Sequence, residues 1–321
     1  MLSRKPIADA TEPNSAHRDP MRGWYEVSWV RSAKLDYIIP ETVAQPVLFS
    51  PHLVPPLAHP DIVERGPRFA AELLCHRFYT YADFTSVLER EAINEVTKDL
   101  SRRVFWAELP AYMYRGAGRI YTDEAFHAQE SDAVLEGIVS STGIEPEFLH
   151  RPRFLTNLDL LCSNLDSGRR RLAMHGFAIV SETLISAILA DIPNDPSVVP
   201  AVRDFVREHA RDEGRHHVYF SELLRYGWPS LSRADRGFLG PLFPRFVRWF
   251  LDPDLEWLRS FLSKRGFRHD QIEEIIGESY PSKKVSENIR SAARHSLARF
   301  AEVGILEENI AADVFRKEGL L

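Results

Sequence analysis

Cysteines, long apolar runs and an excess of basic residues are scarce or missing in this sequence. Only Cys75 and Cys162 occur among its 321 residues, which argues against a disulfide framework or a zinc ribbon and favours a reducing cytoplasm. No stretch of about 18 residues is both apolar and free of charge, so we expect no membrane span. With a formal net charge of -6, the chain has no basic footprint, and we expect no nucleic-acid partner.

The N-terminal residues also lack the apolar segment of a signal peptide. We expect residues 1–22 to form a disordered tail. Prolines then recur every few positions between residues 37 and 60. Because proline fixes φ and has no N–H donor, we expect this stretch to be extended chain that wraps around the protein.

Strand-like alternation is nearly absent, whereas apolar residues recur at three- and four-residue spacing after Pro60. This spacing predicts helices at about 62–78, 80–102, 119–142, 153–166, 170–191 and 199–227. From Leu231 onward it predicts three or four more helices, interrupted by Pro244 and Pro253. The sequence therefore predicts an all-α helical bundle with additional helices.

Glu182 lies in a predicted helix, GFAIVSETLISAILADI, that is apolar on nearly every side. Such a helix is buried, and an isolated buried carboxylate is costly unless it is paired or binds a metal ion. No lysine or arginine lies within two turns of Glu182. A metal ion is one candidate partner, and a distant arginine or a raised pKa is the alternative.

The segment EHARDEGRHHVYF contains His209, Glu213 and His216 at spacing i, i+4, i+7, so the three share one helix face. Imidazole and carboxylate together suit iron, manganese or zinc. A solvated charged face is the alternative, but the charged neighbours lie off this stripe: Arg207, Glu208, Arg211 and Arg215. The stripe continues into Phe205 and Phe220, which are apolar. The pattern favours a metal site.

Glu124 and His127 repeat the Glu-x-x-His element of Glu213 and His216. Two such helices, with one glutamate from each of two others, form the ligand set of di-iron carboxylate bundles. Glu182 supplies one lone glutamate. A third Glu-x-x-His, in EPEFLHRP, lies between prolines and is expected to be accidental.

The other lone glutamate is expected from FTSVLEREAINEV, which offers Glu89, Glu91 and Glu95. Glu89 is favoured because it lies on the less charged face, with Tyr81, Thr85 and Ile93. Glu91 and Glu95 are four residues apart and are expected to face solvent.

Asp123 and Asp212 directly precede the two Glu-x-x-His elements. A carboxylate there can accept the far N–H of a metal-bound histidine. Plain surface charge is the alternative interpretation.

Four successive helices thus carry Glu, Glu-x-x-His, Glu and Glu-x-x-His in that order. This order predicts a ferritin-like, ribonucleotide-reductase-like four-helix bundle core with additional helices and a dinuclear metal site. We expect residues 23–321 to form this single domain, with the metal-binding core at about 62–227.

At this point the chain resembles the AurF-like non-haem di-iron N-oxygenases, whose namesake is p-aminobenzoate N-oxygenase. The resemblance covers about residues 59–225. It includes the His59-Pro60 pair, a tyrosine-bearing helix that ends in Glu89, DE-x-F-H from Asp123, SETLISAIL around Glu182, and H-x-R-D-E-x-x-H from His209. His209 is the most specific feature, because ordinary ferritin-like sites have only two histidines. The resemblance implies seven metal ligands: Glu89, Glu124, His127, Glu182, His209, Glu213 and His216.

The resemblance also implies a reaction. Two iron ions per chain would use dioxygen to oxidise an amine nitrogen to a hydroxylamine, nitroso or nitro group in a biosynthetic pathway. Electrons would come from an external reductase or ferredoxin, because no flavin, haem or iron–sulfur motif is visible in the sequence. The substrate would be a small-molecule or carrier-bound amine, and the chain would form a homodimer.

The implied substrate pocket involves Tyr81, Thr85 and Ser186. The chain departs from the namesake there, because Ser186, Phe84 and Thr85 stand where the resemblance implies other polar side chains. A free aryl carboxylate would lose its anchors, so p-aminobenzoate is not the expected substrate.

Alternatives to an N-oxygenase remain. Other di-iron oxidases, such as C–H hydroxylases, desaturases or radical-generating subunits, share most ligands but usually lack a histidine at the position of His209. Iron-storage proteins use shorter bundles. A structural helical protein with internally paired charges would bind no iron.

Overall fold

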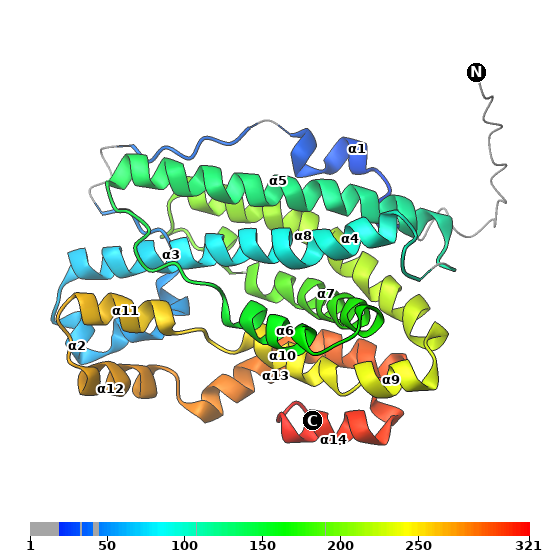
Figure 1. Ribbon diagram of the computed structural model, residues 1–321. Coiled ribbons are helices and arrows are strands. Elements are labelled where there is room, and N and C mark those ends of the chain that lie inside the picture. The colour runs from blue at the N-terminus through cyan, green and yellow to red at the C-terminus, as the bar shows by residue number, and fades with distance from the viewer. Residues whose placement is uncertain (1–18, 33, 41–44, 107, 190) are drawn as a thin grey trace.

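The computed structural model of the protein describes residues 19–321 except 33, 41–44, 107 and 190, and it describes no side chains for 186–189. The part of the chain so described is all-α and ferritin-like, without a β-strand, which confirms the predicted fold class (Figure 1). Residues 1–18 of the expected tail lie outside this description.

Four long elements form the core. The first consists of α3 (Pro67–Leu88), the π-helical segment η4 (Glu89–Ile93) and α4 (Asn94–Ser101). The others are α5 (Ala111–Thr142), α7 (Ser167–Leu189) and α8 (Pro200–Ser230). The first element packs on α5, α5 on α8, and α8 on α7. Each helix therefore turns one face to a shared interior (Figure 1).

The predicted division into helices 62–78 and 80–102 is wrong. One continuous element runs from Pro67 to Ser101, and α2 (Pro60–Val63) is a separate turn. The break falls at Gly66, whose φ of +81° is accessible mainly to glycine. No such residue occurs near Tyr79, which is fully buried inside α3.

Helix α5 begins at Ala111, eight residues before the predicted start at 119. Two glycines, Gly116 and Gly118, lie in this first part and weaken its helical pattern. Packing compensates: a Cβ placed on Gly116 would lie 3.0 Å from the ring of Tyr219 on α8. The helices approach each other closely at this point, and the contact overrides the low helix propensity of glycine.

The N-terminal segment crosses the core helices. Helix α1 (Trp24–Val27) lies along α5, and the turn η1 (Trp29–Arg31) contacts both α5 and α8 (Figure 1). Residues 19–22, which we expected in the tail, form a turn, and Met21 is fully buried beside Gly116. The proline-rich stretch contains only the short 3-10 turns η2 (Pro51–Leu53) and η3 (Pro55–Ala58) among its described residues.

Residues 231–321 form six α-helices rather than the three or four predicted. They are α9 (Arg233–Leu239), α10 (Leu242–Leu251), α11 (Glu256–Lys264), α12 (His269–Ser279), α13 (Ser282–Glu302) and α14 (Asn309–Lys317). Short turns separate them, including η6 (Ile305–Glu307). Pro244 does not interrupt α10, because the first turn of a helix needs no N–H donor there.

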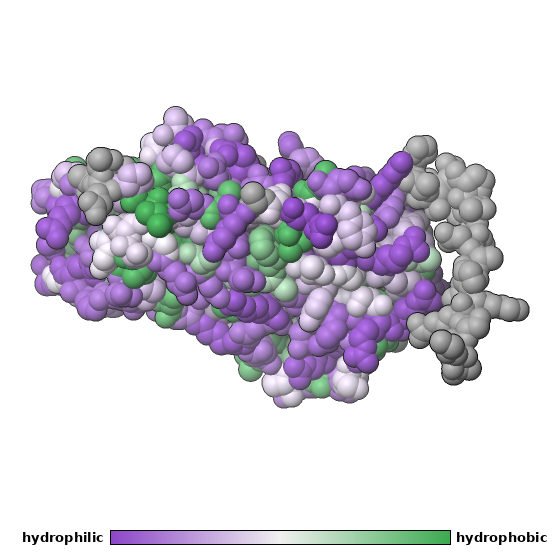
Figure 2. Space-filling model, turned by 90° about the horizontal axis from the view of Figure 1, so that it is seen from above, coloured by the Kyte–Doolittle hydropathy of each residue, from purple (hydrophilic) through white to green (hydrophobic). Residues whose placement is uncertain are grey.

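Three of the additional helices, α9, α10 and α13, pack on α7 on the side away from α5, whereas α11 and α12 lie below α3 (Figure 1). Helix α10 packs on α7 and on α6 (Arg153–Ser163), and α13 also packs on α7. The turn η5 (Ile192–Asn194) connects α7 to α8. The face that carries α1 and α5 is mainly hydrophilic with scattered hydrophobic residues (Figure 2). No helix in the described part of the chain is long and apolar enough to cross a membrane.

Candidate metal centre

Seven predicted site residues meet in the interior of the four-helix core. Each of them is at most 2% exposed. The π segment η4 contributes one, α5 two, α7 one and α8 three: Glu89; Glu124 and His127; Glu182; His209, Glu213 and His216. The structure thus gathers residues that are up to 127 positions apart, from Glu89 to His216, in one place.

The seven residues form two overlapping groups. Glu89, His127, His209 and Glu213 make one group, in which one ligand atom from each residue lies within 4.8 Å of the others. The second group meets the same criterion: Glu124, Glu182, Glu213 and His216. Glu213 belongs to both groups, so its carboxylate stands between them. Four carboxylates would balance the charge of two divalent cations, with all three imidazoles neutral.

The atoms that face one another are close but are not aligned as hydrogen bonds. His209 Nε2 lies 3.0 Å from Glu89 Oε1, and His216 Nδ1 lies 2.8 Å from Glu124 Oε1. All four of these atoms nevertheless lack a hydrogen-bond partner among the described residues, as does Oε2 of Glu182. Buried polar atoms are nearly always satisfied, by hydrogen bonds or by coordination to a metal. The donor set of the centre therefore fits metal ions.

The π-helical turn that begins at Glu89 was not predicted. Its sequence, EREAI, consists of good helix formers, so no residue type indicates the wider turn. An inserted residue of this kind rotates the helix that follows, and π turns are frequent at functional sites. Here the turn begins at Glu89, one of the residues of the centre. Glu91 faces outward in an exposed ion pair of 2.9 Å with Arg151.

Asp123 and Asp212 each pair with a histidine on the opposite helix of the α5–α8 pair. Asp123 on α5 lies 3.2 Å from Nε2 of His216 on α8, and Asp212 on α8 lies 3.1 Å from Nε2 of His127 on α5. With Nε2 engaged in this way, Nδ1 of both imidazoles faces the centre. A carboxylate behind a histidine fixes its tautomer and its ring orientation.

The N-terminal segment supplies further partners for both aspartates. Trp24 Nε1 donates to both carboxylate oxygens of Asp123 at 2.8 and 2.9 Å, and Ser28 Oγ donates to Asp123 at 2.5 Å. The backbone N–H of Trp29 donates to Asp212 at 3.1 Å. Sequence reasoning missed these residues. The only signal was the aromatic run GWYEVSW in an otherwise polar N-terminal region.

The ring of Trp29 also packs against the imidazole of His127, with the ring centroids 5.6 Å apart. Phe205 packs against Trp29 and against His209. This aromatic wall excludes water from one side of the centre. Electrostatic interactions within the centre are therefore stronger than they would be in solvent.

Burial and mutual charge shift the pKa values in the centre. Burial raises the pKa of Glu89 to about 7, against the opposing effect of His209. Burial and the charges of Glu213 and Glu124 hold the pKa of Glu182 well above its ordinary value. Burial would lower the pKa of His209, but Glu213 and Glu89 outweigh it and raise the value to about 9. Metal ions would displace the protons held here, because ligands bind in their deprotonated forms.

The three residues predicted to contact the substrate, Tyr81, Thr85 and Ser186, are not among the seven residues of the centre. Tyr81 is buried, and its hydroxyl has no hydrogen-bond partner among the described residues. Thr85 donates its hydroxyl to the backbone carbonyl of Tyr81 at 2.9 Å, so that hydroxyl is already engaged within α3. The side chain of Ser186 lies outside the described residues. The Glu147–His150 element takes no part in the centre, since His150 pairs with Asp254 at 3.2 Å.

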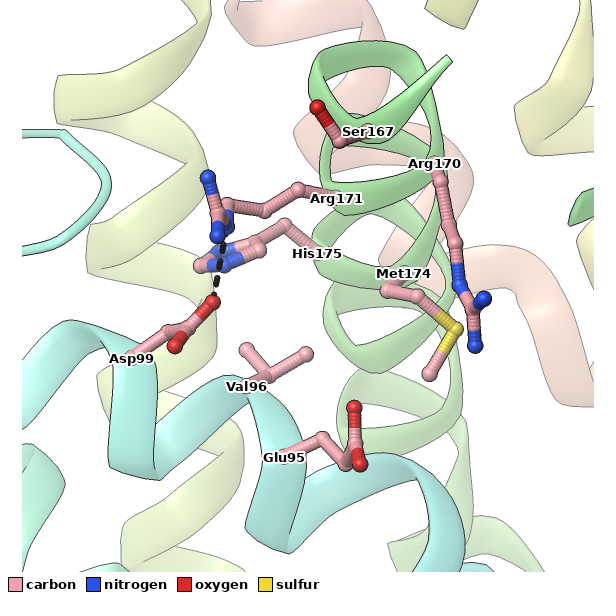
Figure 3. A pocket seen from close by; sticks show the side chains of 8 residues that line it. All are labelled: Glu95, Val96, Asp99, Ser167, Arg170, Arg171, Met174 and His175. Atoms are coloured by element: carbon pink, nitrogen blue, oxygen red, sulfur yellow. Dashed lines mark hydrogen bonds and ion pairs between the residues drawn. The ribbon is translucent and has the colours of Figure 1, made fainter. Parts of the chain in front are cut away.

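A separate pocket of about 190 Å³ lies between α4 and α7 (Figure 3). Arg171 pairs with Asp99 across it at 2.9 Å, and His175 forms part of its wall. Both ring nitrogens of His175 lack a hydrogen-bond partner among the described residues. Phe105 and Trp106 pack against its ring. Burial, with a smaller effect of Arg171, lowers the pKa of His175 to about 3, so this histidine is neutral.

The fold and the site together define a class of protein: a ferritin-like bundle with two overlapping, buried groups of carboxylates and histidines that could hold metal ions. The chain belongs to the family described as P-aminobenzoate N-oxygenase AurF, which matches residues 11–304. It is also 24% identical over 232 residues to a 4-aminobenzoate N-oxygenase of Streptomyces thioluteus, which covers 70% of this chain and 67% of that protein. The predicted family is thus confirmed, and membership supports an oxygenase.

Proposed function

We propose that this protein is a non-haem di-iron oxygenase that uses dioxygen to N-oxygenate an amine, yielding a hydroxylamine, nitroso or nitro group in secondary metabolism. The observation that carries this proposal is the pair of overlapping groups that share Glu213 and leave their facing atoms without hydrogen bonds. Family membership supports the same chemistry. Iron suits the mixed imidazole and carboxylate donors.

Each group would hold one iron ion, with Glu213 placed to contact both. Bound iron would supply the redox and Lewis-acid chemistry of oxygen activation. The protein fixes the donors: Asp123 and Asp212 hold two of the imidazoles in one tautomer, so that Nδ1 points inward. His209 adds a third neutral donor where a carboxylate would add negative charge. The centre is therefore more positive than it would be with a carboxylate at this position.

The test begins with metal content. Protein reconstituted anaerobically with Fe(II) and then desalted should contain about two irons per chain by plasma mass spectrometry. Glu89→Ala and His209→Ala should each reduce this content. Glu91→Ala is the matched control, because Glu91 lies two residues from Glu89 but is paired with Arg151 on the exposed side. Fewer than one iron per chain, or equal effects of the two glutamate variants, would contradict the dinuclear assignment.

The reaction is tested next. The reduced, iron-loaded protein would be mixed with oxygenated buffer and a panel of amines, and products would be identified by mass spectrometry. Oxygen incorporated at nitrogen supports the proposal. Oxidation at carbon would instead favour a C–H hydroxylase or desaturase.

Partners and compartment form part of the same proposal. Electrons would come from an external reductase or ferredoxin, and the chain would act as a cytoplasmic homodimer. Cys75 and Cys162 are both unpaired, which suits a reducing compartment. Light scattering on a size-exclusion column measures the oligomeric state, and a mass of a single 36.8 kDa chain would contradict the homodimer.

A further inference from the structure

The metal centre is closed off from the surface of the protein. None of its seven candidate ligands is more than 2% exposed. An external electron donor therefore cannot touch them, and each electron must cross part of the protein. Electron transfer slows steeply with distance, and it is faster along covalent and hydrogen bonds than across gaps between unbonded atoms. The centre therefore needs a short bonded route from one of its ligands to the surface.

Hydrogen bonds connect His216 to the indole of Trp24. Nδ1 of His216 faces the centre, 2.8 Å from Glu124 and 3.3 Å from Glu213. Nε2 of the same imidazole lies 3.2 Å from Asp123, and Nε1 of Trp24 donates to both carboxylate oxygens of Asp123 at 2.8 and 2.9 Å. Two hydrogen-bonded steps thus lead from a candidate ligand to an indole.

Trp24 lies just beneath the surface of the protein. It is 8% exposed, and its ring meets the ring of Tyr25 edge-on, with the centroids 5.0 Å apart. Tyr25 is 62% exposed, and the guanidinium of Arg119 lies 5.5 Å from the centroid of its ring, a contact that favours one orientation of the ring. Helix α1, which carries both aromatic residues, lies on the outside of the bundle (Figure 1). A donor protein that binds over α1 would therefore come into contact with this aromatic pair.

The corresponding aspartate on α8 offers no aromatic route. Asp212 pairs with Nε2 of His127 at 3.1 Å, and its other partners are the guanidinium of Arg215 and the backbone N–H of Trp29. The ring of Trp29 contacts His127 only through space, and Trp29 is 1% exposed. Within the described part of the chain, the bonded aromatic route thus exists on one side of the centre, through Asp123.

We propose that electrons enter the protein at Trp24 and pass through Asp123 and His216 to the metal centre. This inference rests on the proposed oxygenase function and adds the path by which the centre is reduced. The donor is an external protein that carries one electron at a time. In each transfer the donor loses one electron and one ferric ion becomes ferrous, so two transfers reduce the centre. No bond forms or breaks, and the indole keeps its N–H.

A ruthenium label beside Trp24 measures this path without turnover. Glu26 is exposed and both native cysteines are buried, so Glu26→Cys would react selectively with a maleimide of ruthenium tris(bipyridine). Under light, ascorbate gives one electron to the label, which passes it to the oxidised, iron-loaded centre. Transient absorption of the label gives the rate of transfer. Electron paramagnetic resonance identifies the acceptor through the signal of an iron pair with one ferrous and one ferric ion.

Trp24→Phe in the labelled protein should slow the transfer about tenfold or more, because phenylalanine has no N–H to donate to Asp123. Ser28→Ala is the matched control. Ser28 also donates to Asp123, at 2.5 Å, but lies off the path, so its loss should disturb His216 and leave the rate unchanged. Thermal unfolding shows whether each variant folds, and rates are compared at equal iron content per chain.

Two outcomes would overturn the path. One is an unchanged rate in a folded, iron-loaded Trp24→Phe variant. The other is equal slowing by Trp24→Phe and Ser28→Ala, because both residues would then act only by supporting Asp123.

The two proposals fail separately. Transfer that depends on Trp24, in a protein that N-oxygenates no amine, would refute the proposed function and leave the path in place. N-oxygenation of amines by a protein whose reduction does not respond to Trp24→Phe would refute the present inference alone.

Discussion

Substitution of Trp24 tests whether a residue that is not itself a candidate ligand supports the metal centre. Asp123 has three partners: Trp24 Nε1, Ser28 Oγ and His216 Nε2. Trp24→Phe removes the first and leaves the other two. A hydrogen bond to a charged group contributes about 1.5–3 kcal/mol to stability, and the smaller ring leaves a cavity that adds to the loss. We expect the free energy of unfolding to fall by about 3 kcal/mol.

The effect should reach the metal through Asp123 and His216. Loss of a partner behind a metal-bound histidine typically lowers metal affinity about 10- to 100-fold. Iron retention against a graded series of chelator concentrations measures this affinity. Urea unfolding of the metal-free protein gives the stability term separately.

Trp29→Phe is the matched control. Trp29 reaches Asp212 through its backbone N–H, which the substitution keeps. We expect this variant to hold iron more tightly than Trp24→Phe. If Trp24→Phe retained iron as the natural protein does while Trp29→Phe lost it, the hydrogen bond to Asp123 would not be what orients His216, and the reasoning would be refuted.

Three further predictions concern stability. Burial lowers the pKa of His175 to about 3, so the contribution of this neutral histidine to the free energy of unfolding is complete above about pH 6.5. That contribution is lost as the pH falls toward 3, at up to about 1.4 kcal/mol per pH unit. The slope of the unfolding free energy against pH should therefore be shallower in His175→Phe. Gly137→Ala should lower the free energy of unfolding by about 1–3 kcal/mol, because the new Cβ would lie 2.7 Å from Cβ of Tyr37. Gly214→Ala has open space around it and should raise the free energy of unfolding by about 1 kcal/mol. Urea unfolding measures both changes. Removal of iron by a chelator should lower the Tm by about 6 °C, since ligand at 1,000 times its Kd contributes about 4 kcal/mol and the unfolding entropy of a chain of 321 residues is about 0.7 kcal/mol per kelvin. An unchanged Tm would mean that no metal is bound to the folded state.

The candidate ligands could be predicted because their signal is local. Glu213 and His216 share a helix face by spacing alone, and Glu182 lies in a helix with no nearby cation. The four helices follow from the same periodicity. Their assembly into one site then needs only the rule that apolar faces pack together.

Other features depend on contacts between distant residues. No residue type indicates that the turn at Glu89 is π-helical, because its residues also suit an ordinary helix. The roles of Trp24 and Ser28 depend on Asp123, about a hundred positions away. Local patterns carry no information on such pairs.

The crossing of the N-terminal segment over α5 and α8 has a consequence for the order of assembly. Residues 24–29 leave the ribosome before their partners Asp123 and Asp212, which follow the contacting tryptophans by 99 and 183 positions. Loop closure over such distances is slow, so these contacts form late in folding. A partly made chain that ends after α5 has one Glu-x-x-His element and Asp123, the partner of Trp24. It still lacks α7 and α8, which carry four of the seven candidate ligands. All seven candidate ligands are therefore present together only after α8 has been synthesised.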